Sequence, residues 1–427
     1  MGIVKQLISG FKDEKKKRLI ENYFSLSVLQ GANYLLPLIT LPYLVRVLGA
    51  EKFGLVMFAQ AFMQYFIIFS DYGFNLSATR EISVNRDNRQ KVSEIYSSIM
   101  IIKTVIILLS FGILAFVVFF FTKFRDDWLF YFLAYGMVVG QAYFPIWFFQ
   151  GMEKMKFITI LNITAKVVFT VLVVAIVREP EDFIYVPFFT SLGYLVAAVS
   201  SLWIIFKRFK VSLMVPPIKI IYGYLKDSTQ FFLSRVSVSF YTNSNTFVVG
   251  LVLGNTAAGF YSAAEKLFNA MVMLYKPLAD TLYPFMSHKK DLRLYKKIFI
   301  VTSGFNLVFC ALVFLFSGFI INLIYGDGFQ LSAELLKIFS ILCAILVPSV
   351  LLGYPLLAAM GYPRYANYSV IIASLVHLVI LGIMIPFLNI YLVAILLIIT
   401  QLIVILIRIY GIKKNLINGQ GNTVCVE

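Results

Sequence analysis

Residues 100–121 read MIIKTVIILLSFGILAFVVFFF, a run in which Lys103 is the only charged side chain. The length of this run matches the roughly twenty apolar residues that an α-helix needs to cross a bilayer core of about 30 Å. A second run, 390–407, has no charged residue. Of all 427 residues, 60% are hydrophobic and 14% are charged, whereas about 25% are charged in a typical soluble domain. This balance predicts a membrane protein and excludes a soluble enzyme, a nucleic-acid-binding protein and a secreted disulfide scaffold.

Apolar runs of this kind recur along the whole chain. They predict an all-α polytopic membrane protein with about twelve transmembrane helices in two six-helix lobes. The helices are expected at about 23–45, 54–76, 96–122, 128–150, 157–178, 183–206, 228–253, 257–286, 298–325, 332–360, 366–388 and 390–412. The domains expected from these spans are a cytoplasmic interfacial segment (1–22), an N-lobe (23–206), a cytoplasmic linker (207–227), a C-lobe (228–412) and a cytoplasmic tail (413–427).

Basic residues set the orientation of these spans. With the N-terminus inside, the inner segments hold about 26 Lys and Arg and the outer loops about five. This excess is the positive-inside pattern, so both termini are expected in the cytoplasm. The net charge of +16 therefore reflects membrane orientation rather than nucleic-acid binding. The basic run 15–18 is expected to anchor an interfacial helix on anionic lipid.

Motifs for enzymatic or metal chemistry are missing from the sequence. The three cysteines show no CxxC spacing, and the two histidines, His288 and His377, are far apart, so no metal site is expected. His377 is interpreted as an ordinary helix residue. Because the chain also has no Walker loop and no constellation of catalytic residues, we expect neither an enzyme nor a bound cofactor.

The two halves share an internal repeat. Leu48-Gly49, Gly54 and Ala59 recur 205 residues later as Leu253-Gly254, Gly259 and Ala264, and Pro145, Gly151 and Lys154 recur 210 residues later as Pro355, Gly361 and Arg364. Because each half has six spans, both copies run in the same direction through the membrane. The pattern predicts a parallel pseudo-two-fold repeat, as in some transporters.

A polar face is repeated with it. Gln60, Gln64, Asp71 and Asn75 share one side of a helix, and adding 205 gives Glu265, Asn269, Lys276 and Asp280. Lipid cannot solvate these groups, so the face is expected to line a water-filled cavity, most simply one between the lobes. Basic residues in the spans outnumber acidic ones, which predicts a cationic cavity that attracts an anion.

Candidate residues follow from this pattern. The predicted substrate-binding residues are Arg235, Lys276, Lys166, Lys266, Gln60 and Asn269, and the predicted gating or ion-coupling residues are Asp71, Glu265 and Asp280. Asp71 and Lys276 occupy equivalent positions and could form a gate pair. The Ser and Thr residues near Arg235 are interpreted as interhelical hydrogen-bonding groups. Lys103 and Lys337 lie near the ends of their spans and are expected to extend to the membrane surface.

Three stretches resemble a known family: LPYLVRVLGAEKFGLVMFAQAFMQYF (41–66), SDYGFNLSATREIS (70–83) and PIWFFQGMEKMKFI (145–158). They are similar to the Wzx-type (RfbX-like) polysaccharide repeat-unit flippases of the multidrug/oligosaccharidyl-lipid/polysaccharide exporter superfamily. The resemblance implies two lobes in a V around a cavity in the bacterial cytoplasmic (inner) membrane. It implies that the protein moves undecaprenyl-diphosphate-linked oligosaccharide units of the O-antigen or capsule type to the outer leaflet by alternating access. A polysaccharide polymerase and a chain-length regulator are the partners that it suggests.

Two other functions are compatible with the sequence. A multidrug cation antiporter of the same superfamily would need an unpaired carboxylate in the first lobe, often in the first helix, but that helix offers only Gln30, Asn33 and Pro37. A membrane-bound polymerase or ligase of lipid-linked sugars would be expected to have a large outer loop, and every outer loop is short. A coupling ion, proton or sodium, is compatible with the flippase but not required, because the membrane potential itself favours outward movement of an anion.

Overall fold

The computed structural model describes residues 14–417, and in this part of the chain every regular element is a helix. The side chains of several residues inside the helices α2 (Glu14–Asp71) and α10 (Ile218–Leu253) fall outside the description. These include the side chains of Arg235 and of residues 15–18, so the predictions for these side chains remain untested.

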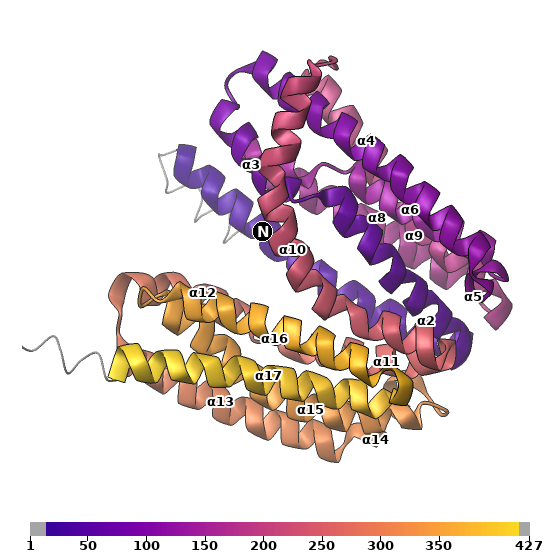
Figure 1. Cartoon of the computed structure of the whole chain (residues 1–427), viewed down its shortest axis with the longest axis vertical. Coiled ribbons are helices and arrows are strands. Elements are labelled where there is room, and N and C mark those ends of the chain that lie inside the picture. Colours follow the sequence, from indigo (N-terminus) through magenta and orange to yellow (C-terminus); the bar gives the residue numbers. More distant parts are fainter. Residues whose placement is uncertain (1–13, 418–427) are drawn as a thin grey trace, which may run out of the picture. The chain divides into compact units, whose positions relative to one another are not determined.

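Helices cover the predicted spans, but their bounds differ: one helix, α2, runs through the first two spans, and α10 begins inside the segment expected to be a linker (Figure 1). Their bounds are α2 (Glu14–Asp71), α3 (Phe74–Asn85), α4 (Arg89–Phe120), α5 (Thr122–Arg125), α6 (Trp128–Ala142), α7 (Ile146–Gly151), α8 (Met155–Ile176), η1 (Pro180–Ile184), α9 (Tyr185–Lys207), α10 (Ile218–Leu253), α11 (Asn255–Met273), α12 (Lys276–Lys289), α13 (Leu292–Leu315), α14 (Ser317–Tyr325), α15 (Gln330–Leu351), η2 (Leu352–Ala358), α16 (Pro363–Met384), η3 (Ile385–Phe387), α17 (Ile390–Ile412) and η4 (Lys413–Ile417). Within the described chain, nine helices are long and apolar enough to cross a membrane, and Ser244–Leu253 is a shorter apolar helix. The all-helical, multi-pass fold is thus confirmed.

Glycines of the first repeated patch break the helices in the same way. Gly49, inside α2, has φ 67° and ψ 176°, and Gly254, just before α11, has φ 95° and ψ 173°. Only glycine adopts this region of backbone space readily. The same rare conformation at positions 205 residues apart shows that the repeat predicted from the side chains is also a repeat of the backbone.

The second repeated patch keeps its backbone but changes its register. Glu153 and Gly361 have positive φ angles of 56° and 95°. In each copy the following amide bonds a carbonyl five residues back, Lys154 N to Phe149 O and Tyr362 N to Leu357 O, both at 2.8 Å. Positions 153 and 361 differ by 208, so the backbone repeat is two residues out of register with the 210-residue offset predicted from side-chain identity.

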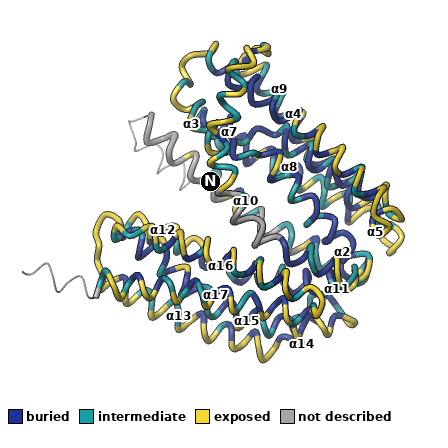
Figure 2. Tube along the Cα trace, viewed as in Figure 1, coloured by how far each residue is buried: buried dark blue, intermediate teal, exposed yellow. Residues whose placement is uncertain are grey.

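The chain divides into two compact units, and unit 1 comprises Met1–Gly49 and Ala59–Val236. In it α9 packs against α6 and α8, and α3 packs against α7. The fully buried Trp147, Phe148 and Phe149 belong to its core. Along α4 an outer face of exposed apolar residues, Leu108, Leu109 and Phe116 among them, is suited to lipid, and Figure 2 shows exposed and buried positions alternating along this helix.

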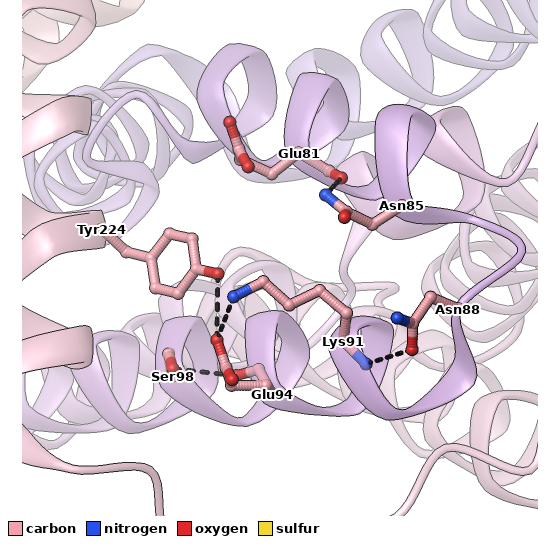
Figure 3. A network of polar contacts seen from close by, with 7 residues as sticks. All are labelled: Glu81, Asn85, Asn88, Lys91, Glu94, Ser98 and Tyr224. Carbon is pink, nitrogen blue, oxygen red and sulfur yellow. Dashed lines mark hydrogen bonds and ion pairs between the residues drawn. The ribbon is translucent and has the colours of Figure 1, made fainter.

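The segment after α9 is bound to unit 1 by polar contacts. The amides of Ser212 and Met214 donate to the hydroxyls of Ser93 and Ser97 on α4, both at 3.1 Å. In Figure 3 the Tyr224 hydroxyl, from α10, donates to the carboxylate of Glu94 at 3.3 Å, and the same carboxylate pairs with the Lys91 ammonium at 2.6 Å. The first turns of α10 are therefore fixed on the helices of unit 1.

Unit 2 comprises Ala50–Phe58 and Ser237–Glu427. In it α15 packs against α11, α13 and α17. The repeated glycines meet within this unit: a Cβ on Gly54 would lie 1.7 Å from the carbonyl oxygen of Asn255, and one on Gly259 would lie 2.1 Å from that of Ala50. No side chain larger than hydrogen fits at this helix crossing, which explains why glycine occupies both positions.

Candidate functional site

Unit 1 contains a hollow among its membrane-spanning helices that is lined by both polar and apolar side chains. It consists of two adjoining cavities of about 260 Å³ and 200 Å³. Three residues from three helices line both: Gln64 on α2, Gln141 on α6 and Tyr194 on α9. We call this pair of cavities the N-unit hollow.

The polar face predicted on the second span lines this hollow. Gln60 and Gln64 line the larger cavity, and Gln64, Asp71 and Asn75 line the smaller one. Asp71 is the last residue of α2, where the helix breaks at Tyr72 and Gly73, which both have positive φ. These four side chains therefore line cavities within unit 1, and the water-filled cavity expected between the lobes stays a prediction.

Two lysines supply positive charge to the hollow. Lys166, on α8, is half-buried and lines the larger cavity beside Thr170. Lys103, on α4, lines the smaller cavity, is only 3% exposed, and donates from Nζ to the carbonyl oxygen of Ala142 at 3.4 Å. The expectation that Lys103 extends to the membrane surface is wrong. A carbonyl at the C-terminus of α6 attracts the ammonium, because helix C-termini carry partial negative charge.

Glycines set the positions of the cavity walls. A Cβ on Gly140 of α6 would lie 2.6 Å from the Cβ of Tyr194, and a Cβ on Gly193 of α9 would lie 2.6 Å from the carbonyl oxygen of Ala165. The residues that directly follow Gly140, Gly193 and Ala165 are Gln141, Tyr194 and Lys166, and all three line the hollow. Close helix packing at the glycines thus places the polar side chains.

The charge balance of the hollow favours an anion. Its described lining contains the ammonium groups of Lys103 and Lys166 and a single carboxylate, Asp71. Amide, hydroxyl and phenol groups of the lining add hydrogen-bond partners. A cavity with excess positive charge and many neutral polar groups can replace part of the hydration of an anionic, hydroxyl-rich group.

The other predicted residues whose side chains the structure describes lie in unit 2. The Glu265 carboxylate accepts a hydrogen bond from the Thr246 hydroxyl at 2.9 Å. Lys266 is half-buried, whereas Asn269, Lys276 and Asp280 have exposed side chains on α11 and α12. Lys337 pairs with Glu334 at 2.9 Å and is partly exposed.

Sequence reasoning missed a buried cation of unit 2. The Arg408 guanidinium, only 6% exposed, donates to the Ser349 carbonyl at 2.6 Å and to the Ser369 hydroxyl at 3.1 Å. His377 is fully buried and contacts Thr400. The adjacent pair Thr400-Gln401 inside the uncharged run 390–407 was a signal that this helix faces polar partners.

Comparison with known proteins agrees with the helical, multi-pass architecture. The family model described as "Polysaccharide biosynthesis protein" matches residues 19–290. The chain belongs to this polysaccharide biosynthesis family, which confirms the resemblance drawn from the sequence.

Relatives and solved structures extend the comparison. Proteins of Escherichia coli (strain K12) and Shigella dysenteriae, both named "Putative O-antigen transporter", are 29% identical over 86% and 84% of this chain and 90% and 91% of their own lengths. The fold is similar to that of the lipid II flippase MurJ in an inward closed conformation (TM-score 0.69, 14% identity, 92% of this chain and 87% of MurJ). It is also similar to an inward-facing multidrug resistance MATE family transporter of the MOP superfamily (TM-score 0.67, 14% identity, 95% and 100%). These names describe transporters and flippases rather than enzymes.

Proposed function

We propose that this protein is a flippase that moves undecaprenyl-diphosphate-linked oligosaccharide repeat units from the inner to the outer leaflet of the bacterial cytoplasmic membrane. The observation that carries the proposal is the N-unit hollow, a space among membrane-spanning helices whose lining combines apolar and polar side chains with two lysines and one carboxylate. Membership of the polysaccharide biosynthesis family and the O-antigen transporter name of the relatives support the same cargo.

The chemistry of such a cargo matches the hollow. A diphosphate carries negative charge that hydrocarbon cannot solvate, and a buried ammonium such as that of Lys166 compensates for lost hydration. The sugars present hydroxyl groups, for which Gln60, Gln64 and Gln141 are suitable partners. Lys166 and Gln60 are thus our first candidates for substrate contact, and Arg235, Lys266, Lys276 and Asn269 remain proposed contacts of a later stage in alternating access.

Direction and coupling follow from charge. We place both termini in the cytoplasm, in keeping with the positive-inside pattern. With the inside negative, outward movement of one negative charge is favoured by about 2.3 kcal/mol per 100 mV, so an ion gradient can assist the transport without being essential. Glu265 and Asp280 are proposed ion-coupling residues, and Asp71 with Lys276 a proposed gate pair.

Reconstitution provides the test. The protein is placed in liposomes that carry lipid-linked oligosaccharide in one leaflet, and its appearance in the other leaflet is measured. Lys166→Gln should lower the initial rate by about tenfold to a hundredfold, because a hydrogen bond to a charged group contributes about 1.5–3 kcal/mol. Lys337→Gln is the matched control: it removes a lysine from a membrane-spanning helix, but one that pairs with Glu334 and is partly exposed.

Three results would contradict the proposal. Wild-type liposomes that transfer no lipid-linked oligosaccharide would refute the function itself. Equal rates for Lys166→Gln and Lys337→Gln would remove the N-unit hollow from the transport path. Gradient-driven efflux of an organic cation, abolished by Asp71→Asn, would instead assign the hollow to a multidrug antiporter.

A further inference from the structure

A third cavity of unit 1, of about 340 Å³, is lined by residues of α3, α4 and α10 and shares no lining residue with the N-unit hollow. Its charged lining residues are Arg80 and Glu81 on α3 and Asp227 on α10. Three hydroxyl groups, one amide and four apolar side chains complete the lining. We call this space the α3–α10 cavity.

The helices α3 and α10 run antiparallel where they meet. A Cβ on Gly73, just before α3, would lie 2.8 Å from the backbone nitrogen of Phe232 on α10. One turn further along α3, the Ser77 hydroxyl lies 2.7 Å from that of Ser228, which is one turn earlier on α10. The glycine and the two serines are small, so they hold the helices close together at this end of the cavity.

One turn beyond the serine pair, larger polar side chains occupy both helices. The Tyr224 phenol, on α10, lies close to the Glu81 carboxylate on α3. The same phenol donates to Glu94 on α4, which pairs with Lys91 at 2.6 Å (Figure 3). The charge of Lys91 is thus already balanced by Glu94.

The charged groups of the cavity do not neutralise one another. Within the described chain, the Arg80 guanidinium and the carboxylates of Glu81 and Asp227 form no hydrogen bond or ion pair. Arg80 and Asp227 are exposed and Glu81 is half-buried, so all three are accessible from outside. One cation and two anions around a single cavity suit a ligand that itself carries both signs of charge.

The surroundings of Arg80 indicate a lipid as the source of this ligand. Leu76 and Val84 lie one turn before and one turn after Arg80 on the same side of α3, and they are 57% and 76% exposed. A basic side chain between exposed apolar ones suits the boundary between acyl chains and headgroups, where the apolar parts contact lipid and the charge contacts phosphate. A solute from the cytoplasm would have no use for this exposed apolar face.

We propose that the α3–α10 cavity binds the headgroup of a phospholipid that carries a phosphate and a primary ammonium, as phosphatidylethanolamine does. Arg80 binds the phosphate, and Glu81 and Asp227 accept hydrogen bonds from the ammonium. Two carboxylates against one guanidinium disfavour an anionic lipid such as phosphatidylglycerol. The site holds a membrane lipid rather than the cargo, so it does not depend on the proposed flippase function.

Three lipids with the same acyl chains separate the contributions of the headgroup. The delipidated full-length protein is incubated with phosphatidylethanolamine, phosphatidylcholine and phosphatidylglycerol in equal amounts, and native mass spectrometry measures how much of each stays bound. Phosphatidylcholine has the same phosphate, but its trimethylammonium group has no N–H to donate to a carboxylate. We expect phosphatidylethanolamine to be retained over phosphatidylcholine by about fivefold, the upper end for an exposed ion pair, and phosphatidylglycerol least.

Variants of the two kinds of charged group should give different results. Arg80→Gln removes the phosphate partner and should weaken phosphatidylethanolamine and phosphatidylcholine alike. Glu81→Gln combined with Asp227→Asn removes the ammonium partners and should abolish the preference between these two lipids. Arg89→Gln and Asp87→Asn are the matched controls, because both residues are exposed on the same side of unit 1 but do not line the cavity; both should bind lipid as wild type does. The exposed positions of all these side chains predict unchanged melting temperatures.

Several results would overturn the proposal. Equal retention of phosphatidylethanolamine and phosphatidylcholine by the wild type would show that no carboxylate reads the ammonium, and a preference for phosphatidylglycerol would show that the cavity selects anions. A preference that survives in the double carboxylate variant would place the lipid elsewhere on the protein. Displacement of the bound lipid by millimolar soluble phosphoethanolamine would assign the cavity to a solute instead of a lipid. None of these outcomes bears on transfer of lipid-linked oligosaccharide, which is measured separately.

Discussion

Replacement of Gly193 by alanine perturbs the wall of the N-unit hollow without touching its polar groups. The added Cβ would lie 2.6 Å from the carbonyl oxygen of Ala165, whereas ordinary contacts begin at 3.4 Å. Helices α8 and α9 must therefore separate by about 0.8 Å at this point. The residues that follow the two colliding positions, Lys166 and Tyr194, line the hollow and must move with their helices.

The size of the effect can be estimated against a matched glycine. Alanine in a helix is favoured over glycine by about 0.8–1.0 kcal/mol, and overpacking costs about 1–3 kcal/mol. Gly112, on α4, has nothing within 4 Å of an added Cβ. Gly112→Ala therefore gains the higher helix propensity of alanine without the cost of overpacking. The two variants should differ by about 1–3 kcal/mol in stability, with Gly193→Ala the weaker.

Two measurements are needed, because stability and transport report on different consequences. Thermal unfolding in detergent, followed by tryptophan fluorescence, should give a lower melting temperature for Gly193→Ala than for Gly112→Ala. Transfer of lipid-linked oligosaccharide should be slower in Gly193→Ala, also well below its melting temperature, and unchanged in Gly112→Ala. If Gly193→Ala melts no lower than the control and transports at the wild-type rate, the glycine contact does not position the hollow.

Three further predictions concern charged groups and their partners. Arg408→Met leaves Ser349 and Ser369 without their donor and should destabilise the protein by about 3 kcal/mol or more, measured as a lower melting temperature in detergent; an unchanged value would show that the guanidinium is dispensable. Asp71→Lys and Lys276→Asp should each slow transport and the double exchange should restore it, so failure of the double variant to recover would argue against a gate pair. Thr246→Val removes the hydroxyl that donates to Glu265 and should cost about 1–3 kcal/mol, whereas Thr246→Ser, which keeps the hydroxyl, should melt close to wild type.

The sequence was sufficient for the helices and for the repeat. Twenty-residue apolar runs leave no other structure in lipid, because every backbone polar group must be satisfied within the segment. The Gly49 and Gly254 pair was recognisable because a positive φ restricts the choice of side chain to glycine. The face formed by Gln60, Gln64, Asp71 and Asn75 was predictable for a similar reason, since helical periodicity fixes which residues share a side.

The partners of each face could not be predicted in this way. Periodicity gives a direction around one helix but not the helix that lies opposite, so the burial of Lys103 against the end of α6 was missed. The partners of His377 come from positions 132 and 23 residues away, and no local pattern indicates that distance. The 208-residue backbone offset was hidden because side-chain identity in the second patch persists at a neighbouring register.

The duplicated polar face has different surroundings in the two halves of the chain. In the first copy its members line a hollow with two lysines and one carboxylate, a set that attracts anions. In the second copy Glu265 accepts a hydrogen bond from Thr246, whereas Asn269, Lys276 and Asp280 have exposed side chains on α11 and α12. The two copies have thus kept their polar positions but not the contacts of those positions. Variants of Lys166 should therefore alter affinity for the cargo, because Lys166 lines the hollow that we propose as the binding site.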